Sequence, residues 1–407
     1  MKICLMTSTY KLSAEDKNVP FLSENVRYLV KQGFEVHVFA PSYEGLGSQV
    51  IDGVPVYRFR YFFKRWENLT HKQGAPNRIR NPLYLLVAFF YILSGLFHAV
   101  WFCWKNDFDV IHVHWPFPHG IWGFAASRIS RTPMILTFYG AEILLCKKFF
   151  FVKYFLRHSL KHAAAVICIS RYTAAEVAKL TSRPVEMVPY GCTVRTRPSR
   201  KDPDKPVKDI LFVGRLVRRK GLEYLLRAVP LCDQVPVHLH VVGDGDRATE
   251  WKAEARTLGL NGRVTFHGTV SNEELERQYA NADVFVLPAI VDERGDTEGL
   301  GVVLVEALGF RTPVVASNVG GIPDVIVDNQ TGLLVPEKDP AALAAAIQRL
   351  LRQPELAAEL SGRGLRHARD YFDWGRIVRR QLGIYHAVVD AHRQKRPTPV
   401  LAPAGNG

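Results

Sequence analysis

The chain has 407 residues, a formal net charge of +14 and six cysteines, with 47% hydrophobic and 23% charged residues. At about 100–200 residues per domain this length predicts two or three domains, and the near-average composition excludes a single small module and a wholly disordered chain. The cysteines form no C-x-x-C pair and have no histidine at zinc-site spacing. We therefore expect reduced thiols in a cytoplasmic protein.

The positive charge is confined to the first half of the chain. Residues 1–200 hold 26 Lys and Arg against 12 Asp and Glu, whereas residues 201–407 hold 27 of each. This asymmetry predicts that the N-terminal half faces an anionic partner, such as a phospholipid surface, a pyrophosphate or a nucleic acid. Solubility is the alternative, but it gives no reason for the charge to favour one half.

The first half alternates short apolar runs with a helical pattern. We expect strands at residues 3–6, 36–40, 110–113, 135–138 and 166–169, with a helix at 22–32. Near-continuous apolar strands separated by helices are typical of a parallel sheet covered on both faces. The pattern predicts a doubly wound, Rossmann-like domain over residues 1–194.

Residues 83–104 form an uncharged apolar segment that is long enough to cross a bilayer. A strand-like run at 109–114 follows after only four residues. If the helix spanned a membrane, residues 1–80 would lie across it from the strand with which they should pair. We therefore predict a buried or interfacial helix, and a true span or re-entrant anchor is the alternative.

The second half begins with a charged, proline-bearing stretch that predicts an interdomain linker over residues 195–209. Strands are then expected at 210–213, 237–242, 264–266, 284–287 and 314–316, which gives a second Rossmann-like domain over 210–371. A C-terminal helix around 372–390 should pack back on the first domain, and residues 393–407 should be disordered. Two such α/β domains bind ligand in the cleft between the carboxyl ends of their strands.

A basic, glycine-flanked loop follows the strand at 210–213. It runs from Gly214 to Gly221 and contains Arg215 and Lys220. Glycine lets the backbone approach a ligand, and two cations at the carboxyl end of a strand can clamp a diphosphate. Taken alone, a solvated basic loop explains this pattern as well.

A second pattern follows the strand at 284–287, where a polar loop leads into an apolar helix. Glu298 precedes the helix start and Glu306 lies about two turns further along. The helix N-terminus can bind phosphate oxygens, a carboxylate before it can hold sugar hydroxyls, and one within it can hold a ribose diol. A helix-capping role for Glu298 would leave the acidic Glu306 unexplained inside the apolar run 300–308.

Three motifs together closely resemble the retaining glycosyltransferases of family 4. They are Val213-Gly214-Arg215-Leu216 with Lys220-Gly221, the two glutamates in Glu298-Gly299 and Glu306-Ala307, and Gly320-Gly321-Ile322-Pro323-Asp324 followed by Gly332-Leu333-Leu334-Val335. The resemblance implies the α/β GT-B fold, in which two Rossmann-like domains face each other across a cleft. It also implies a nucleoside diphosphate sugar as the donor, with no bound metal or cofactor.

The resemblance assigns a role to each matching residue. Glu298 would be the catalytic contact to the donor sugar, and Glu306 would hold the ribose. The remaining donor-binding residues would be Arg215 and Lys220 for the diphosphate, and Gly299, Leu300 and Gly301 for phosphate and sugar through their backbone N–H groups.

The first half resembles members that build bacterial surface polysaccharides, in Asn81-Pro82 and in the run 109–115. It departs from the family pattern in a first loop, residues 9–20, without glycine, and in Tyr139, which replaces the histidine of Thr-x-His-Gly. Retention by same-face attack, with the departing phosphate taking the acceptor's proton, does not require that histidine. Tyr139 and His119 are the acceptor-side candidates.

These patterns favour a hexosyltransferase that acts on a lipid-linked or membrane-proximal glycan at the cytoplasmic face of an anionic membrane. The apolar helix at 83–104 and the aromatic, basic run 147–157 supply the insertion and the charge that interfacial binding needs. A GT-B nucleotide-sugar 2-epimerase is an alternative, but it needs no membrane surface. A non-enzymatic polyanion-binding protein is a second alternative, although no basic and aromatic nucleic-acid module is present and we expect no nucleic-acid partner.

Overall fold

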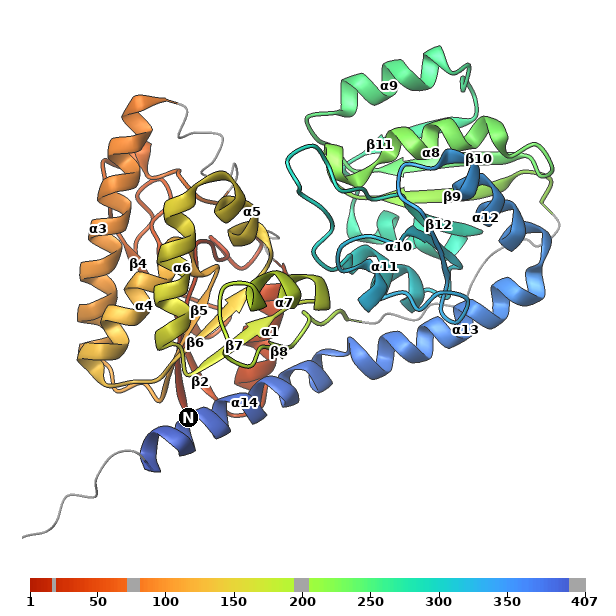
Figure 1. The fold of residues 1–407 in the computed structure, drawn as a ribbon. Helices are drawn as coiled ribbons and strands as arrows, with labels where there is room; N and C mark the ends of the chain where they lie inside the picture. Colours follow the sequence, from red (N-terminus) through yellow and green to blue (C-terminus); the bar gives the residue numbers. More distant parts are fainter. Residues whose placement is uncertain (17–19, 72–80, 194–204, 395–407) are drawn as a thin grey trace, which may run out of the picture.

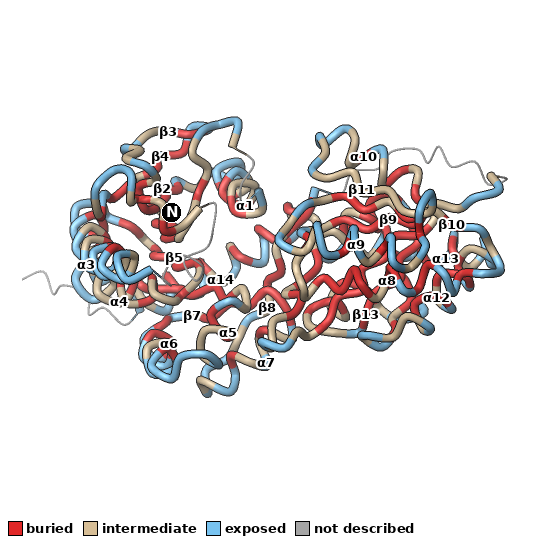
Figure 2. Tube along the Cα trace, turned by 90° about the horizontal axis from the view of Figure 1, so that it is seen from above, coloured by how far each residue is buried: buried red, intermediate tan, exposed pale blue. Residues whose placement is uncertain are grey.

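The computed structural model describes residues 1–16, 20–71, 81–193 and 205–394. It contains two α/β domains, each built on its own sheet, and the C-terminal helices run along one side of both (Figure 1). Seen from above, the buried strands form the middle of each domain and the helices surround them (Figure 2). The two doubly wound domains predicted from the sequence are confirmed.

The N-terminal domain contains an eight-stranded sheet in the order β3-β4-β2-β1-β5-β6-β7-β8. Its strands are β1 (Lys2–Met6), β2 (Glu35–Pro41), β3 (Gln49–Ile51), β4 (Val54–Phe59), β5 (Val110–His114), β6 (Met134–Phe138), β7 (Ala165–Cys168) and β8 (Glu186–Met187). All neighbouring pairs are parallel except β3 and β4. Every residue of β5 and β6 is buried, as expected of strands covered on both faces.

Two helical layers cover this sheet. The outer layer comprises α3 (Pro82–Lys105), α4 (Pro116–Ser130), α5 (Ala141–Lys148), α6 (Phe150–His162) and α7 (Arg171–Ala178), whose apolar side chains share one core cluster with the sheet. The opposite layer consists of α1 (Pro20–Lys31) and α14 (Trp374–Gln394), which share a second cluster. The C-terminal helix of the chain therefore completes the N-terminal domain.

The C-terminal domain contains a six-stranded, fully parallel sheet in the order β11-β10-β9-β12-β13-β14. Its strands are β9 (Lys208–Val213), β10 (Val237–Val242), β11 (Val264–Gly268), β12 (Val284–Leu287), β13 (Val314–Ser317) and β14 (Leu333–Val335). Its helices are α8 (Leu222–Ala228), α9 (Ala248–Thr257), α10 (Asn272–Asn281), α11 (Val302–Gly309), α12 (Pro340–Arg352) and α13 (Pro354–Tyr371).

Each sheet has one position where the strand order reverses. β1 lies between β2 and β5, and β9 lies between β10 and β12. At such a position the loops leaving two neighbouring strands diverge and leave a crevice at the carboxyl ends, which is where open α/β sheets bind ligands. We call these positions the N-terminal and C-terminal switch points.

Two predicted boundaries are wrong by a few residues. β9 begins at Lys208, inside the linker expected over 195–209, because Lys208 pairs with Val237 of β10. Linker residues 194–204 lie outside the described residues. α14 continues to Gln394, past the expected start of the tail at 393, and Arg393 pairs with Asp109 at 3.2 Å. The tail from 395 to 407 also lies outside the described residues.

The hairpin of β3 and β4 was not predicted. Asp52 and Gly53 form its two-residue turn, with φ angles of 50° and 78°. An Asp-Gly pair is typical of the turn type that joins two antiparallel strands most closely. The hairpin extends the sheet at its edge, away from the cleft.

Helix α3 is apolar around its whole circumference. Among the described residues it is the one helix long and apolar enough to cross a membrane. One face of the helix packs on the domain through Val87, Tyr91, Gly95, Ala99, Phe102 and Cys103. The other face exposes large apolar side chains, namely Leu83, Leu85, Leu86, Phe89, Phe90, Ile92, Leu93, Phe97, Trp101 and Trp104. We call these ten residues the apolar face.

The fold leaves no room for the alternative in which α3 spans a membrane. β1 pairs with β2, which precedes α3 in the chain, and with β5, which follows it. The segments before and after α3 therefore belong to one sheet, on which the helix lies. One face of α3 is buried on this sheet and the apolar face is exposed.

Candidate functional site

The C-terminal switch point brings together the loops that follow β9 and β12. The first loop, residues 214–221, contains a short 3-10 helix and turns at Gly221, which has a φ of 63°. A Cβ atom at position 221 would lie 2.0 Å from the carbonyl oxygen of Pro288, where the second loop begins. Glycine is therefore required for the two loops to touch, and their contact places Lys220 against the second loop.

Glu298, the predicted catalytic residue, lies in the second loop and pairs with two cations of the first. Its Oε2 atom is 2.6 Å from Lys220 Nζ and 2.9 Å from Arg219 Nη1. Glu298 is 8% exposed and Lys220 is 6% exposed. Burial opposes the ionisation of Glu298, but Lys220 and Arg219 outweigh it and hold the pKa at about 2. The carboxylate is therefore ionised at neutral pH and fixes two cations in the cleft.

Arg215 does not contact this cluster, and its predicted role in clamping a diphosphate with Lys220 stays a prediction. Arg215 is exposed, and within the described parts of the chain its guanidinium has no hydrogen-bond or ion-pair partner. Arg219 takes the place beside Lys220 instead. The sequence signal for Arg219 is the run of basic residues at 218–220, but the run does not show which side chain turns inward.

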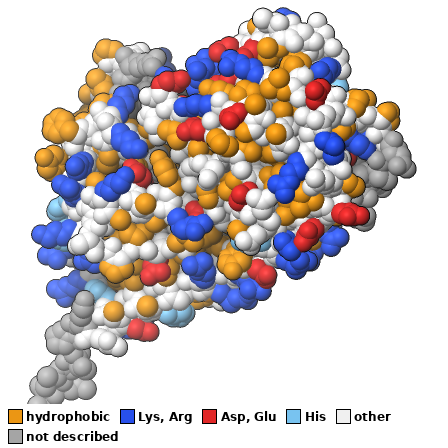
Figure 3. Space-filling model, turned by 45° about the vertical axis from the view of Figure 1, so that its right-hand side comes forward, with side chains coloured by type: hydrophobic (Ala, Val, Ile, Leu, Met, Phe, Trp, Pro, Cys, Tyr) orange, Lys and Arg blue, Asp and Glu red, His pale blue; other side chains and the backbone are white. Residues whose placement is uncertain are grey.

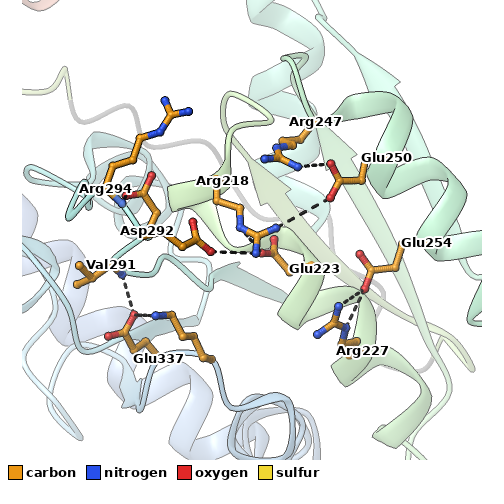
Figure 4. Close-up of polar contacts among 12 residues, drawn as sticks. Arg218, Glu223, Arg227, Arg247, Glu250, Glu254, Val291, Asp292, Arg294 and Glu337 are labelled. Atoms are coloured by element: carbon orange, nitrogen blue, oxygen red, sulfur yellow. Dashed lines mark hydrogen bonds and ion pairs between the residues drawn. The ribbon is translucent and has the colours of Figure 1, made fainter.

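Arg218 holds the basic loop in place. Its guanidinium lies 3.7 Å from Glu223, 4.0 Å from Glu250 and 3.1 Å from Glu293. Figure 4 shows Arg218 reaching between Glu223 and Glu250. Glu223 is buried, and this burial raises its pKa. Because the three carboxylates come from α8, α9 and the loop after β12, Arg218 ties these elements to one another.

The residues after Glu298 form the N-terminus of α11. Gly301 is the cap residue, with a φ of 88°, and the Leu300 side chain is fully buried. The Gly321 N–H donates a hydrogen bond to the carbonyl oxygen of Glu298 at 2.9 Å, and a Cβ at position 321 would lie 2.1 Å from the carbonyl oxygen of Gly299. The backbone from 299 to 301 is thus held where free helix N–H groups attract anions.

Glu306 lines a cavity of about 670 Å³ between the two domains. Phe21 and Arg27 of α1 form part of the N-terminal wall, and Tyr279 of α10 lies beside Glu306. The Tyr279 hydroxyl donates a hydrogen bond to Glu306 Oε2 at 2.8 Å. Burial and the neighbouring Glu306 raise the Tyr279 pKa, so the hydroxyl remains a donor. The cavity has the size of a nucleoside-binding site and presents a carboxylate to it.

Tyr139 meets the donor-side loop from the N-terminal domain. A Cβ atom at Gly299 would lie 3.3 Å from the Tyr139 carbonyl oxygen. The Tyr139 hydroxyl lies 2.6 Å from His114 Nδ1, and its ring stacks on Trp115 with 4.5 Å between the centroids. The structure therefore brings the acceptor-side candidate Tyr139 to the loop of Glu298.

Trp115 was not a predicted site residue. It directly follows β5, at the N-terminal switch point, and contacts Phe21 and Tyr139. Its φ is 52°, and a bulky side chain in this left-handed region is strained, a feature that concentrates at functional sites. The sequence shows a tryptophan at the end of a strand, but it does not show the backbone angle.

His119, the other acceptor-side candidate, is buried and held by two hydrogen bonds. It is 2% exposed, with Nδ1 2.7 Å from the Trp115 carbonyl oxygen and Nε2 2.9 Å from the Tyr91 hydroxyl. Burial lowers its pKa to about 4, so the ring is neutral, donates through Nδ1 and accepts through Nε2. The acceptor-side role of His119 stays a prediction, and its partner Tyr91 lies on α3, 28 residues away, where the loop sequence gives no sign of it.

Glu142 is a buried carboxylic acid beside Tyr139. Its Oε2 accepts hydrogen bonds from the Gly140 N–H at 3.0 Å and the Tyr139 N–H at 3.3 Å, whereas its buried Oε1 has no hydrogen-bond partner among the described residues. Burial raises the pKa to about 7. Glu142 therefore shapes the loop that carries Tyr139.

Arg171 joins the two domains on a further side of the cleft. Its backbone N–H donates to Asp324 Oδ2 at 2.7 Å, and its guanidinium pairs with the same carboxylate and donates to the Pro323 carbonyl oxygen at 2.9 Å. Asp324 ends the Gly-Gly-Ile-Pro-Asp run, whose first two residues support the Glu298 loop. The motif therefore serves both the site and the domain contact.

Comparisons with known proteins agree with this geometry. Residues 21–195 match the family model "Glycosyltransferase Family 4" and residues 195–367 match "Glycosyl transferases group 1". A phosphatidyl-myo-inositol mannosyltransferase of Mycobacterium leprae is 32% identical over 291 residues, covering 70% of this chain and 74% of the relative. The putative teichuronic acid biosynthesis glycosyltransferase TuaC of Bacillus subtilis is 26% identical over 389 residues, covering 88% and 92%.

Solved structures share the arrangement of the two domains. HepE of Anabaena, crystallised in complex with UDP, superposes with a TM-score of 0.72 at 19% identity, covering 95% of this chain and 100% of that one. At this identity the likeness shows the fold alone. Fold, motifs and sequence relatives together show that the chain belongs to the family 4 glycosyltransferases and has the GT-B fold.

Proposed function

We propose that this glycosyltransferase moves a hexose-like sugar from a nucleoside diphosphate sugar to a lipid-linked or membrane-proximal glycan, with retention of configuration, in surface polysaccharide biosynthesis. The observation that carries the proposal is the cluster of Glu298, Lys220 and Arg219 at the mouth of α11, next to the interdomain cavity of Glu306. The UDP bound to HepE supports a nucleotide-sugar donor, and the names of the M. leprae and B. subtilis relatives support a glycan or glycolipid product.

The donor roles follow from the chemistry of this cluster. Lys220, Arg219 and the exposed Arg215 supply positive charge to the leaving diphosphate, together with the N–H groups at the start of α11. Glu306 accepts hydrogen bonds from the ribose hydroxyls, and Glu298 accepts them from the donor sugar. Because these groups neutralise the diphosphate, the proposal includes no metal or cofactor.

The transfer itself needs no protein base. The bond between C1 and the diphosphate oxygen breaks, and the acceptor hydroxyl oxygen bonds to C1 from the same face. The acceptor's proton passes to the departing diphosphate oxygen. Tyr139 in place of a histidine, with its hydroxyl at 2.6 Å from the buried His114, fits this route.

We further propose that the outer helical layer of the N-terminal domain binds the cytoplasmic face of an anionic membrane. The apolar face of α3 supplies the insertion, and α5 and α6 add the exposed residues Phe150, Phe151, Tyr154, Lys148 and Lys153. Hydrophobic side chains project at the left edge of the molecule with basic side chains below them (Figure 3). Lys147 contributes less, because it pairs with Glu176 at 3.5 Å.

Donor use can be tested with UDP, GDP and ADP sugars in assays of hydrolysis and of protection against heat. We expect one donor class to protect the protein and to yield a product that keeps the anomeric configuration. Glu306→Ala should lower donor affinity by about 1.5–3 kcal/mol per lost charge-assisted hydrogen bond, whereas the exposed Glu355→Ala should not. A C2-epimerised nucleotide sugar without a glycan product would instead support the 2-epimerase.

Membrane binding can be tested by sedimentation with vesicles. Binding should rise with the fraction of anionic lipid and fall with added salt. Phe97→Glu on the apolar face should abolish it, whereas Leu231→Glu, at an exposed apolar residue of the C-terminal domain, should not. A protein that stays in the supernatant with anionic vesicles at low salt has no such interface.

A further inference from the structure

A groove of about 840 Å³ lies at the edge of the N-terminal sheet opposite the cleft. Met134, Ala165 and Glu186, the first residues of β6, β7 and β8, line it, whereas the cleft lies at the carboxyl ends of the strands. α4 and the end of α6 form one wall and α14 forms the other. No residue of the proposed donor or acceptor site lines it, so the groove is separate from the catalytic machinery.

The groove is strongly basic. Glu186 is its one carboxylate, and its cationic or titratable basic side chains are Arg128, Arg131, His162, Arg183, Arg380 and His392. Arg128 and Arg380 reach in from opposite walls, and within the described parts of the chain neither guanidinium has a hydrogen-bond or ion-pair partner. Lys, Arg and His side chains gather at the lower left of the space-filling view (Figure 3).

Helix capping explains only part of this charge. Arg183 donates to the Lys161 carbonyl oxygen at 2.9 Å, and His392 Nε2 lies 2.8 Å from the Arg131 carbonyl oxygen. Such contacts satisfy the last carbonyl groups of α6 and the carbonyl group that follows α4. They give no role to Arg128 or Arg380, whose charges remain uncompensated in the groove.

The local field is positive enough to affect a neighbouring histidine. Burial lowers the pKa of His162, and the charges of His158, Lys161, Arg128 and Arg183 lower it further. The positive charges that disfavour a proton on His162 favour the binding of an anion in the groove.

Apolar side chains lie among the basic ones in the lining of the groove. They are Phe124, Met134, Ala163, Ile384 and Val388, which we call the floor of the groove. The volume far exceeds that of an inorganic anion, so the groove has room for a larger molecule that carries an anionic group. The combination suits an amphiphile with an anionic head and an apolar remainder.

We propose that this groove binds an anionic membrane phospholipid, with the phosphate between Arg128 and Arg380 and the apolar part of the lipid along the floor. Guanidinium groups match phosphate through paired, charge-assisted hydrogen bonds. α4 and α6 belong both to the groove and to the outer helical layer proposed to face the membrane, so lipid in the bilayer can reach the groove. The site anchors the protein and lies outside the transfer reaction.

Calorimetry with dihexanoyl phosphatidic acid below its micelle concentration tests the proposal on the full chain. The wild-type protein should bind it, and should bind dihexanoyl phosphatidylcholine and inorganic phosphate at least tenfold more weakly. Arg128→Gln combined with Arg380→Gln should weaken binding of the phosphatidic acid at least tenfold. Arg379→Gln is the matched control, because Arg379 is exposed on the same helix but does not line the groove.

The variants should keep the wild-type melting temperature and donor hydrolysis, since neither arginine lies in the cleft. The proposal would be overturned if the double variant bound phosphatidic acid as tightly as the wild-type protein does, or if the wild-type protein did not bind it. Equal affinity for inorganic phosphate would overturn the lipid assignment. The assay uses no donor and no bilayer, so its outcome is independent of the proposed transferase activity and of the apolar face.

Discussion

Each domain has a switch point at the carboxyl ends of its strands, but the side chains around the two switch points differ. At the C-terminal switch point, glycine-flanked loops bring Glu298, Lys220 and Arg219 within hydrogen-bond distance. At the N-terminal switch point and the neighbouring β6 loop, the aromatic rings of Trp115 and Tyr139 stack at 4.5 Å and buried histidines lie beneath them.

This difference separates two kinds of recognition. Fixed charges on touching loops suit a diphosphate, whose own charge compensates them when it binds. Aromatic faces suit the apolar face of a sugar ring and hold it without a net charge. Under the proposed function, the topology sets where each ligand binds, and the loop residues set which ligand it is.

The largest expected effect concerns the stability of the N-terminal side. Burial raises the pKa of Glu142 from 4.5 to about 7, so the folded state binds more protons than the unfolded state between these values. Stability should therefore be full below pH 4.5 and fall as the pH rises through 7, by up to about 3 kcal/mol. Glu142→Gln mimics the protonated acid and should remove this dependence in denaturant titrations at pH 5 and pH 8. If the stability of the variant depended on pH as strongly as that of the wild type, the dependence would come from groups other than Glu142.

The next effect concerns catalysis at the C-terminal side. Glu298→Gln removes the charge that compensates Lys220 and Arg219 and weakens the grip on the donor sugar. Losing about 1.5–3 kcal/mol from one charge-assisted hydrogen bond should lower kcat about 10- to 100-fold. Affinity for the nucleoside diphosphate should be unchanged or higher, because both cations become available to it. Unchanged kcat would remove Glu298 from the mechanism.

Two arginines of one loop should then behave in opposite ways. Arg215→Ala should weaken binding of nucleoside diphosphate about tenfold, with little effect on the bare nucleoside or on the melting temperature. Arg218→Ala should lower the melting temperature, because it leaves Glu223 buried without its partner at 3.7 Å. Calorimetry and thermal unfolding of both variants separate the two roles. Equal losses for diphosphate and nucleoside in Arg215→Ala would mean that the residue acts through folding.

The smallest effect concerns the aromatic side. Trp115→Ala removes a stacking contact worth about 0.5–1.5 kcal/mol and should raise the acceptor KM a few-fold. Donor hydrolysis without acceptor should not change. Tyr139→Phe keeps the ring stacked on Trp115 and should have a weaker effect. A change in the donor KM alone would show that Trp115 acts on donor binding and not on acceptor binding.

The helices and strands could be predicted from the sequence better than the directions in which individual side chains point. The buried strands and the apolar run at 83–104 carry a local pattern, so their existence followed from periodicity. The inward turn of Arg219 depends on the contact of Gly221 with Pro288, which no local pattern encodes. The burial of His119 could not be predicted for the same reason, because its partner Tyr91 comes from a distant helix. The Asp52-Gly53 turn was readable but missed, since its short strands lack a long apolar run.

The route of the chain between the domains constrains how the enzyme moves. The Cys192 N–H donates to the Phe372 carbonyl oxygen at 2.8 Å, and Cys192 also forms a β-bridge with Asp373. The outgoing and returning segments are therefore joined where the chain leaves and re-enters the N-terminal domain. We therefore expect any opening of the cleft to be a rotation about this paired crossing. A fragment ending at residue 194 would lack α14 and expose the apolar side of α1, so we expect it not to fold as an independent domain.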